Sequence, residues 1–95
     1  MIIEALDPEI TSASTAPTAA AGAGITYTAT ATGPGSARGW SWVIVDDGTS
    51  GVTIDELTGV MSGGNGAAAG DYTIRIVCGG YHGRAPWSLG WTVTP

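Results

Sequence analysis

Apolar and polar residues alternate over several short stretches of this chain, and this period of two predicts β-strands. The clearest stretches are 25–32 (ITYTATAT), 71–78 (DYTIRIVC) and 87–94 (WSLGWTVT), each of which places its apolar side chains on one face. Shorter strands are expected at 9–14, 40–45, 51–54 and 59–62. These stretches and the turn residues between them predict an all-β sandwich of about seven antiparallel strands.

The stretch 40–45 (WSWVIV) differs from the others because both of its faces are apolar. Trp40, Trp42 and Ile44 share one face. Val43 and Val45 lie on the opposite face. Since a strand that is apolar on both faces is typical of one covered on both sides, we expect something to cover these two valines.

Segments rich in glycine, alanine and proline separate the expected strands. Loops are predicted at 15–24, 33–39, 63–70 and 79–86. Residues 1–8 (MIIEALDP) form an apolar arm ahead of a single domain at 9–95. Two interpretations of the arm stay open: a frayed terminus or short edge strand of its own domain, or a segment that docks on a neighbouring subunit.

The segment 51–77 carries the most informative pattern in the chain. Asp55 begins a tight turn, because an aspartate side chain can bond the backbone just downstream. Gly59 ends the turn, because glycine takes a positive φ at no steric cost. Tyr72 then opens the long alternating strand and points inward with Ile74, Ile76 and Cys78.

Three motifs in this segment, Thr53-Ile54-Asp55, Thr58-Gly59-Val60 and Gly70-Asp71-Tyr72, resemble those of Ig-like domains found in phage virion proteins and bacterial surface proteins. The resemblance is sharpest over 51–77 and looser over 9–95. It implies an Ig-like β-sandwich with Trp42 as the core ring and Tyr72 at a tyrosine corner. Ile74 stands where an antibody domain has a cysteine, so no cross-sheet disulfide is implied.

The charge of the chain narrows the classes of partner. The net charge is −5, which disfavours binding to nucleic acid and to an anionic membrane surface. No apolar run approaches the roughly 20 residues of a membrane-spanning helix. The N-terminus lacks the basic and apolar regions of a signal peptide, so synthesis in a cytoplasm is expected. The single cysteine, Cys78, has no intrachain partner.

The residues that carry reactive chemistry are few, and no enzyme is expected. Cys78 and His82 lie at a strand-to-loop boundary, but an inward-facing cysteine is usually an inert small hydrophobe. One histidine and one cysteine are too few for a zinc site. The acidic pairs Asp46-Asp47 and Asp55-Glu56 read as turn residues rather than as calcium ligands. We therefore expect no catalytic residue, cofactor or metal.

Residues suited to contact a protein partner occur in the arm and in the loop 79–86. Tyrosine and arginine are enriched at interface hot spots, and the loop holds both between glycines. The expected contact residues are Met1, Ile2, Ile3, Leu6, Tyr81, His82 and Arg84. Trp87, Trp91 and Tyr81 could instead form a platform for sugars, although Trp87 and Trp91 share a face with apolar neighbours and so suit the core.

The resemblance implies an accessory structural protein of a phage virion, most specifically a capsid decoration protein. A phage capsid or tail protein would be its partner, with the chain as a homo-oligomer or bound to a lattice. The alternatives are a protein of the phage tail or neck and a module that binds carbohydrate or a host surface. Since Ig-like folds serve many roles, these functions remain expectations.

Overall fold

The computed structural model describes residues 9–32, 41–80 and 83–95, and this part of the chain is all-β. It contains nine strands rather than about seven. Their bounds are β1 (Glu9–Ile10), β2 (Ala19–Ala20), β3 (Tyr27–Thr28), β4 (Ala31–Thr32), β5 (Ser41–Asp46), β6 (Val52–Ile54), β7 (Val60–Gly63), β8 (Gly70–Gly80) and β9 (Gly83–Thr94).

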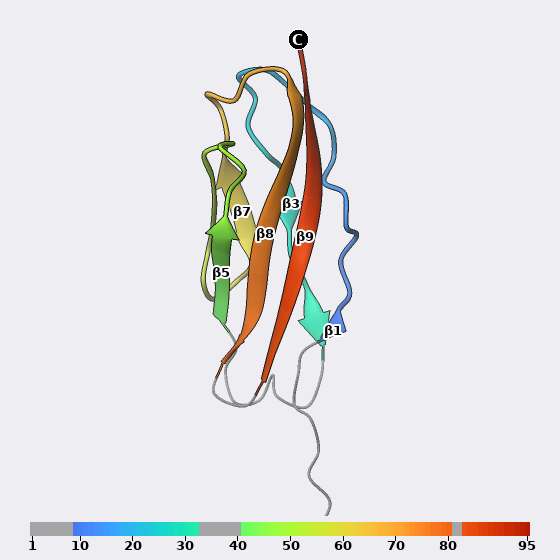
Figure 1. Ribbon diagram of the computed structural model, residues 1–95, viewed down its shortest axis with the longest axis vertical. Helices are drawn as coiled ribbons and strands as arrows, with labels where there is room; N and C mark the ends of the chain where they lie inside the picture. Colours follow the sequence, from blue (N-terminus) through green and yellow to red (C-terminus); the bar gives the residue numbers. More distant parts are fainter. Residues whose placement is uncertain (1–8, 33–40, 81–82) are drawn as a thin grey trace, which may run out of the picture.

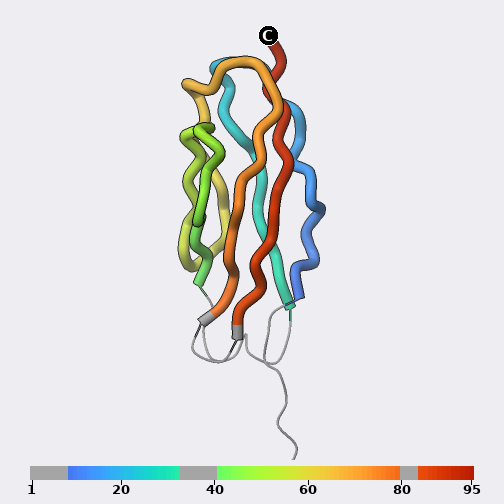
Figure 2. The backbone as a smooth tube through the Cα atoms, in the orientation of Figure 1, coloured from blue at the N-terminus to red at the C-terminus, as the bar shows by residue number. Residues whose placement is uncertain are grey.

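The strands form two layers (Figure 1). One layer is a four-stranded sheet in the order β2-β9-β8-β5, and the other holds a three-stranded sheet, β3-β7-β6, with the short pair β1-β4. The hairpin of β8 and β9 runs along most of the first layer, and the tube in Figure 2 shows both strands continuous over this length. This hairpin positions the surface described below.

Two features of the pairing differ from the expected all-antiparallel sandwich. The segment 15–24, expected as a loop, contains β2, which pairs parallel to β9 with Ala19 opposite Val93. Hydrogen bonds between Ala16 N–H and the Gly90 carbonyl, at 2.8 Å, and between Gly90 N–H and the Ser14 carbonyl, at 2.9 Å, hold the segment along β9. β1 lies in one layer and β2 in the other, so the chain crosses between the layers in the segment that joins them.

The expected strand at 25–32 is divided between two partners. Its first part, β3, pairs with β7, and its second part, β4, pairs with β1. Its alternation nevertheless holds, because Ile25 and Ala29 are buried while Tyr27 and Ala31 pack partly buried against the core. The inward face predicted from the sequence is therefore confirmed.

The core lies between the two layers and contains the residues expected there. Trp42 is 7% exposed, and Ile74, Ile76 and Cys78 from β8 are buried beside it. From β9, Leu89, Trp91 and Val93 are buried, whereas Trp87 is half-buried against the cluster. The prediction that Trp42 belongs to the core is confirmed.

The turn between β6 and β7 has the geometry that its sequence predicts. One Asp55 carboxylate oxygen, Oδ1, accepts hydrogen bonds from the backbone N–H groups of Leu57 and Thr58, each at 2.9 Å. Gly59 has a φ of 76° and donates its N–H to the Asp55 carbonyl at 3.0 Å. The turn is therefore a rigid unit that joins two short strands.

We predict that Asp55 makes stability depend on pH. The two backbone hydrogen bonds lower the pKa of its carboxyl group below the usual 3.8. Because the folded protein prefers the ionised form, this contribution is present above the unfolded pKa and is lost as the pH falls through the folded one. Urea unfolding from about pH 6 to about pH 2 should show the free energies of wild type and Asp55→Asn converging in acid. A constant difference across that range would contradict the prediction.

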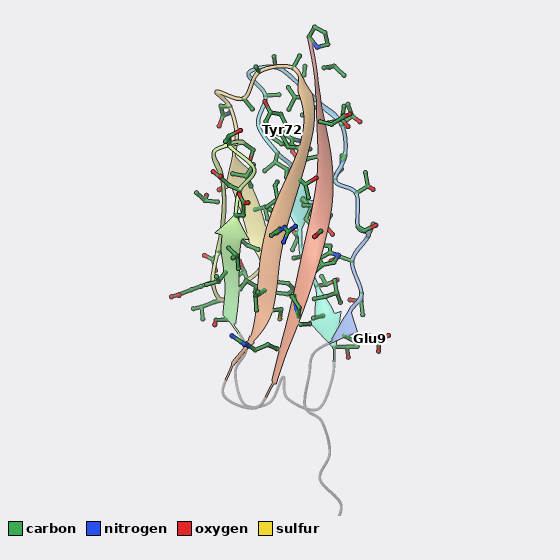
Figure 3. All side chains as sticks on the ribbon, in the orientation of Figure 1. Glu9 and Tyr72 are labelled. Atoms are coloured by element: carbon green, nitrogen blue, oxygen red, sulfur yellow. The ribbon has the colours of Figure 1, made fainter. Side chains whose placement is uncertain are left out.

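Tyr72 contacts both the loop that precedes β8 and the core. Its hydroxyl donates a hydrogen bond of 2.6 Å to the carbonyl of Ala68, four residues upstream, and its ring lies 5.9 Å from that of Trp91. Figure 3 labels Tyr72 near the beginning of β8. This end of the strand follows the loop at 63–70, which is rich in glycine. The side chain thus ties this loop to the start of β8.

Removing the Tyr72 hydroxyl should test this tie. Tyr72→Phe keeps the ring but leaves the Ala68 carbonyl without its donor. We expect the free energy of unfolding to fall by about 1 kcal/mol, the usual net value of one hydrogen bond. Urea denaturation measures the change, and an unaltered midpoint would show that water replaces the hydroxyl at no cost.

Candidate functional site

The outer face of the four-stranded sheet is the main candidate for a binding surface. Side chains alternate along β8, so Ile74 and Ile76 enter the core while Arg75 and Val77 point outward. The strand register places Val77 between Val43 on β5 and Pro86 on β9. The β8–β9 hairpin and the more distant strand β5 therefore contribute to one outward row.

This outward row leaves large apolar side chains in solvent. Val43 is 52% exposed and Val45 is 64% exposed, and both rank among the few large hydrophobic residues that the described chain leaves exposed. Pro86 is also exposed and Val77 is half-buried. The sequence predicted that something would cover these valines, and nothing in the described chain does. Adjoining exposed apolar side chains are typical of a contact surface.

Two shallow depressions hollow this face and meet at Val45 and Val77. One, of about 460 Å³, is also lined by Arg75, Pro86 and Ser88. The other, of about 280 Å³, extends toward Ser41, Val43, Gly79 and Arg84. Because Val45 and Val77 line both, the two depressions form one continuous apolar surface.

Two arginines flank the apolar surface, which we call the valine–arginine face and define by Val43, Val45, Val77, Pro86, Arg75 and Arg84. The chain has three basic residues, and the third, Arg38, lies outside the described residues. Both described cations of an acidic chain therefore gather on one face.

Arg75 has no counter-ion within the described part of the chain. Its register partner on β5 is Asp46, but Asp46 Oδ1 accepts a hydrogen bond from Gly48 N–H at 2.8 Å. Farther along the same face, Asp71 accepts a hydrogen bond from the Thr92 hydroxyl at 2.8 Å. The Arg75 guanidinium is thus exposed and open to a carboxylate on a partner.

The structure describes one of the seven contact residues expected from the sequence. Arg84 is exposed and lines the valine–arginine face, but it lies in β9 opposite Gly79 rather than in a loop. The segment 79–86 is mostly strand because β8 and β9 stay paired to their ends. The other expected contacts lie outside the described residues: Met1, Ile2, Ile3, Leu6, Tyr81 and His82.

Sequence reasoning did not name Arg75, Val77 or Pro86 as contact residues. The second apolar face of the strand 40–45 indicated a covered surface, and it pointed to Val43 and Val45 as part of that surface. The alternation of β8 also predicts that Arg75 and Val77 point outward. Which strands lie beside β5 depends on the tertiary pairing, so the local pattern could not join these residues into one surface.

Cys78 is the one described residue of the Cys78–His82 pair that the sequence singled out. Cys78 is fully buried, and burial raises the pKa of its thiol, so the protonated, weakly nucleophilic form persists at neutral pH. His82, its expected neighbour, lies outside the described residues. Within residues 9–32, 41–80 and 83–95, no group of three or more potential ligands gathers in a way that could hold a metal ion.

Trp87 and Trp91 do not form an exposed platform for sugars. Trp91 is 2% exposed and contacts Tyr72, with a ring separation of 5.9 Å. Trp87 is half-buried, and its ring lies 5.9 Å from that of Tyr27. Both rings therefore belong to the interior side of β9, as their shared face with Leu89 predicts.

Comparison with known proteins supports the fold alone. No family model matches the chain, and no curated protein matches it. Among solved structures, the chain is similar to one assigned as an alpha-galactosidase from Bacteroides fragilis, with a TM-score of 0.74 and 19% sequence identity. The match covers 98% of this chain and 19% of that one, so this chain spans about a fifth of that protein's length.

Of the described residues, none belongs to a helix long and apolar enough to cross a membrane.

Proposed function

We propose that this chain is a non-catalytic Ig-like module and an accessory structural protein of a phage virion, most specifically a capsid decoration protein. The observation that carries the proposal is the valine–arginine face, on which Val43 and Val45 remain exposed between Arg75 and Arg84. An apolar centre with arginines at its margin suits contact with a protein surface. A virion is an assembly in which such contacts act.

The strand order supports the Ig-like part of the proposal. Ig-like sandwiches place their first, second, fifth and fourth strands in one sheet and the third, sixth and seventh in the other. With β1 taken as the first strand, and β3 and β4 as two parts of the second, the observed strand neighbours match this order, and β2 is an addition beside β9. The hydrogen bond from Tyr72 to Ala68 also matches the tyrosine corner of such domains.

The location of the protein on virions is the direct test of the proposal. Immunogold electron microscopy of phage particles from the source culture, with antibody to this chain, should place gold on the heads. Gold confined to tails would replace decoration with the tail or neck alternative. Absence of labelling from all particles would overturn the virion role.

A pair of matched variants should show whether the valine–arginine face is the attachment surface. Val45→Asp places a charge in the apolar centre of the face, whereas Val60→Asp places one on the outer side of the other layer, where Val60 is 47% exposed. We expect Val45→Asp to weaken co-sedimentation with virions at least about tenfold, and Val60→Asp to leave it unchanged. Equal effects of the two substitutions would exclude this face as the attachment surface.

A further inference from the structure

The turn between β6 and β7 is the second exposed apolar feature of the molecule. Leu57 is 77% exposed, more than any other large hydrophobic residue that the structure describes. The Glu56 carboxylate is exposed directly beside it. We call residues 55–58 the acidic turn. The acidic turn carries negative charge, opposite to that of the valine–arginine face. Like that face, it also exposes an apolar side chain, Leu57.

The backbone of the acidic turn is fixed before any partner binds. Asp55 holds Leu57 and Thr58 through their N–H groups, and the N–H of Trp42 donates a hydrogen bond of 2.9 Å to the Glu56 carbonyl. The turn is therefore anchored beside β5 and presents Leu57 in a set position. A pre-organised segment loses little conformational entropy on binding.

We propose that the acidic turn of one copy of this chain docks on the valine–arginine face of a second copy. Leu57 packs into the depression at Val45 and Val77, and Glu56 pairs with Arg75. The inference rests on the proposed function, since it names a neighbouring copy in the assembly as the partner of this face. Val43 and Val45 are exposed within the chain, so the acidic turn of the same molecule does not cover them.

Charge favours this contact over a stack of two valine–arginine faces. A two-fold axis through the middle of the face would bring Arg75 and Arg84 of one copy toward the arginines of the other. Like charges placed together oppose association. Docking of the acidic turn instead gives Arg75 a carboxylate partner while covering the same valines. The net charge of −5 likewise disfavours a phosphate-rich occupant of the face.

The purified protein should self-associate without any virion present. Sedimentation equilibrium over a range of concentrations should show reversible association, and Leu57→Ala should weaken it about ten- to hundredfold, as expected for a leucine buried at a contact. Thr18→Ala removes an exposed side chain just ahead of β2, at the opposite edge of the sheet from β5, and should leave association unchanged. A monomer at all concentrations, or equal effects of the two variants, would overturn the proposal.

Charge reversal tests the pairing of the two surfaces. Arg75→Glu and Glu56→Arg should each weaken association, because each brings like charges together. An equimolar mixture of the two variants, or the double variant Glu56→Arg/Arg75→Glu, should recover it. Both side chains are exposed, so a circular dichroism spectrum is expected to confirm that each variant folds. Failure of both the mixture and the double variant to recover association would contradict the contact.

The outcomes separate this inference from the proposed function. Gold on phage heads without self-association in solution would leave the decoration role standing and reject the contact between copies. Self-association with the predicted charge reversal, but without gold on any particle, would support the contact and reject the virion role. The two proposals can therefore fail independently.

Discussion

Replacing Trp42 with alanine is expected to lower the free energy of unfolding by about 3–5 kcal/mol, the cost of removing a buried aromatic ring. Trp42 is 7% exposed, and its ring lies against Gly59 in the turn that precedes β7. It therefore joins β5 of one sheet to the other layer. Since small domains are stable by only about 5–15 kcal/mol, this one substitution removes much of the stability.

The neighbouring residue supplies the control for this prediction. Val43 lies on the same strand but faces outward and is 52% exposed. Val43→Ala should change the free energy of unfolding by about 0.5 kcal/mol or less, as surface substitutions usually do. Thermal and urea unfolding of both variants measure the difference. A shift of only a degree or two in the melting temperature of Trp42→Ala would show that its ring does not support the core.

Replacing Gly59 with alanine is expected to lower the free energy of unfolding by about 2–5 kcal/mol, through backbone strain and overpacking together. Gly59 has a φ of 76°, which residues with a Cβ rarely adopt. A Cβ atom added there would lie 2.5 Å from the Ala29 carbonyl oxygen and 3.2 Å from the Trp42 ring. Because the nearest atom belongs to the backbone, the turn or the chain at Ala29, between β3 and β4, has to move.

Gly51 separates the two contributions to this effect. Its φ is 77°, nearly the same as that of Gly59, but a Cβ added there would meet nothing within 4 Å. Gly51→Ala should therefore cost only the backbone strain, about 1–2 kcal/mol. Urea denaturation of the two variants gives the steric contribution as their difference. Equal losses would show that the contact with the Ala29 carbonyl relaxes freely.

Local sequence patterns predicted the structure correctly in two situations. One is a strand whose alternation sets its inward face, and the other is a turn set by a single side chain. The alternation of 71–78 predicted the inward face of β8, and the apolar pattern of 40–45 predicted that Trp42 is buried. Asp55 and Gly59 predicted their turn because both act on the backbone within a few residues. Such features depend on neighbours in sequence, which the sequence displays directly.

The loop predictions for two segments rich in glycine or alanine were wrong. Residues 79–86 were expected to form a loop, yet Gly79 pairs with Arg84 and Gly80 with Gly83 at the end of the β8–β9 hairpin. The two alanines of β2 carry no strand signal of their own, and their pairing with Val93 and Thr94 makes them a strand. Backbone hydrogen bonds from a partner strand override weak local propensity.

The sequence by itself determined that the chain is all-β, that Trp42 and alternate residues of β8 are buried, and that β5 is apolar on both faces. Only the tertiary structure decided that β8 lies between β5 and β9. That order places Arg75 and Val77 beside Val45 and Pro86 and so creates the valine–arginine face. The reason is physical: alternation sets the face of a side chain within its strand, whereas strand order depends on backbone pairing and packing between distant segments.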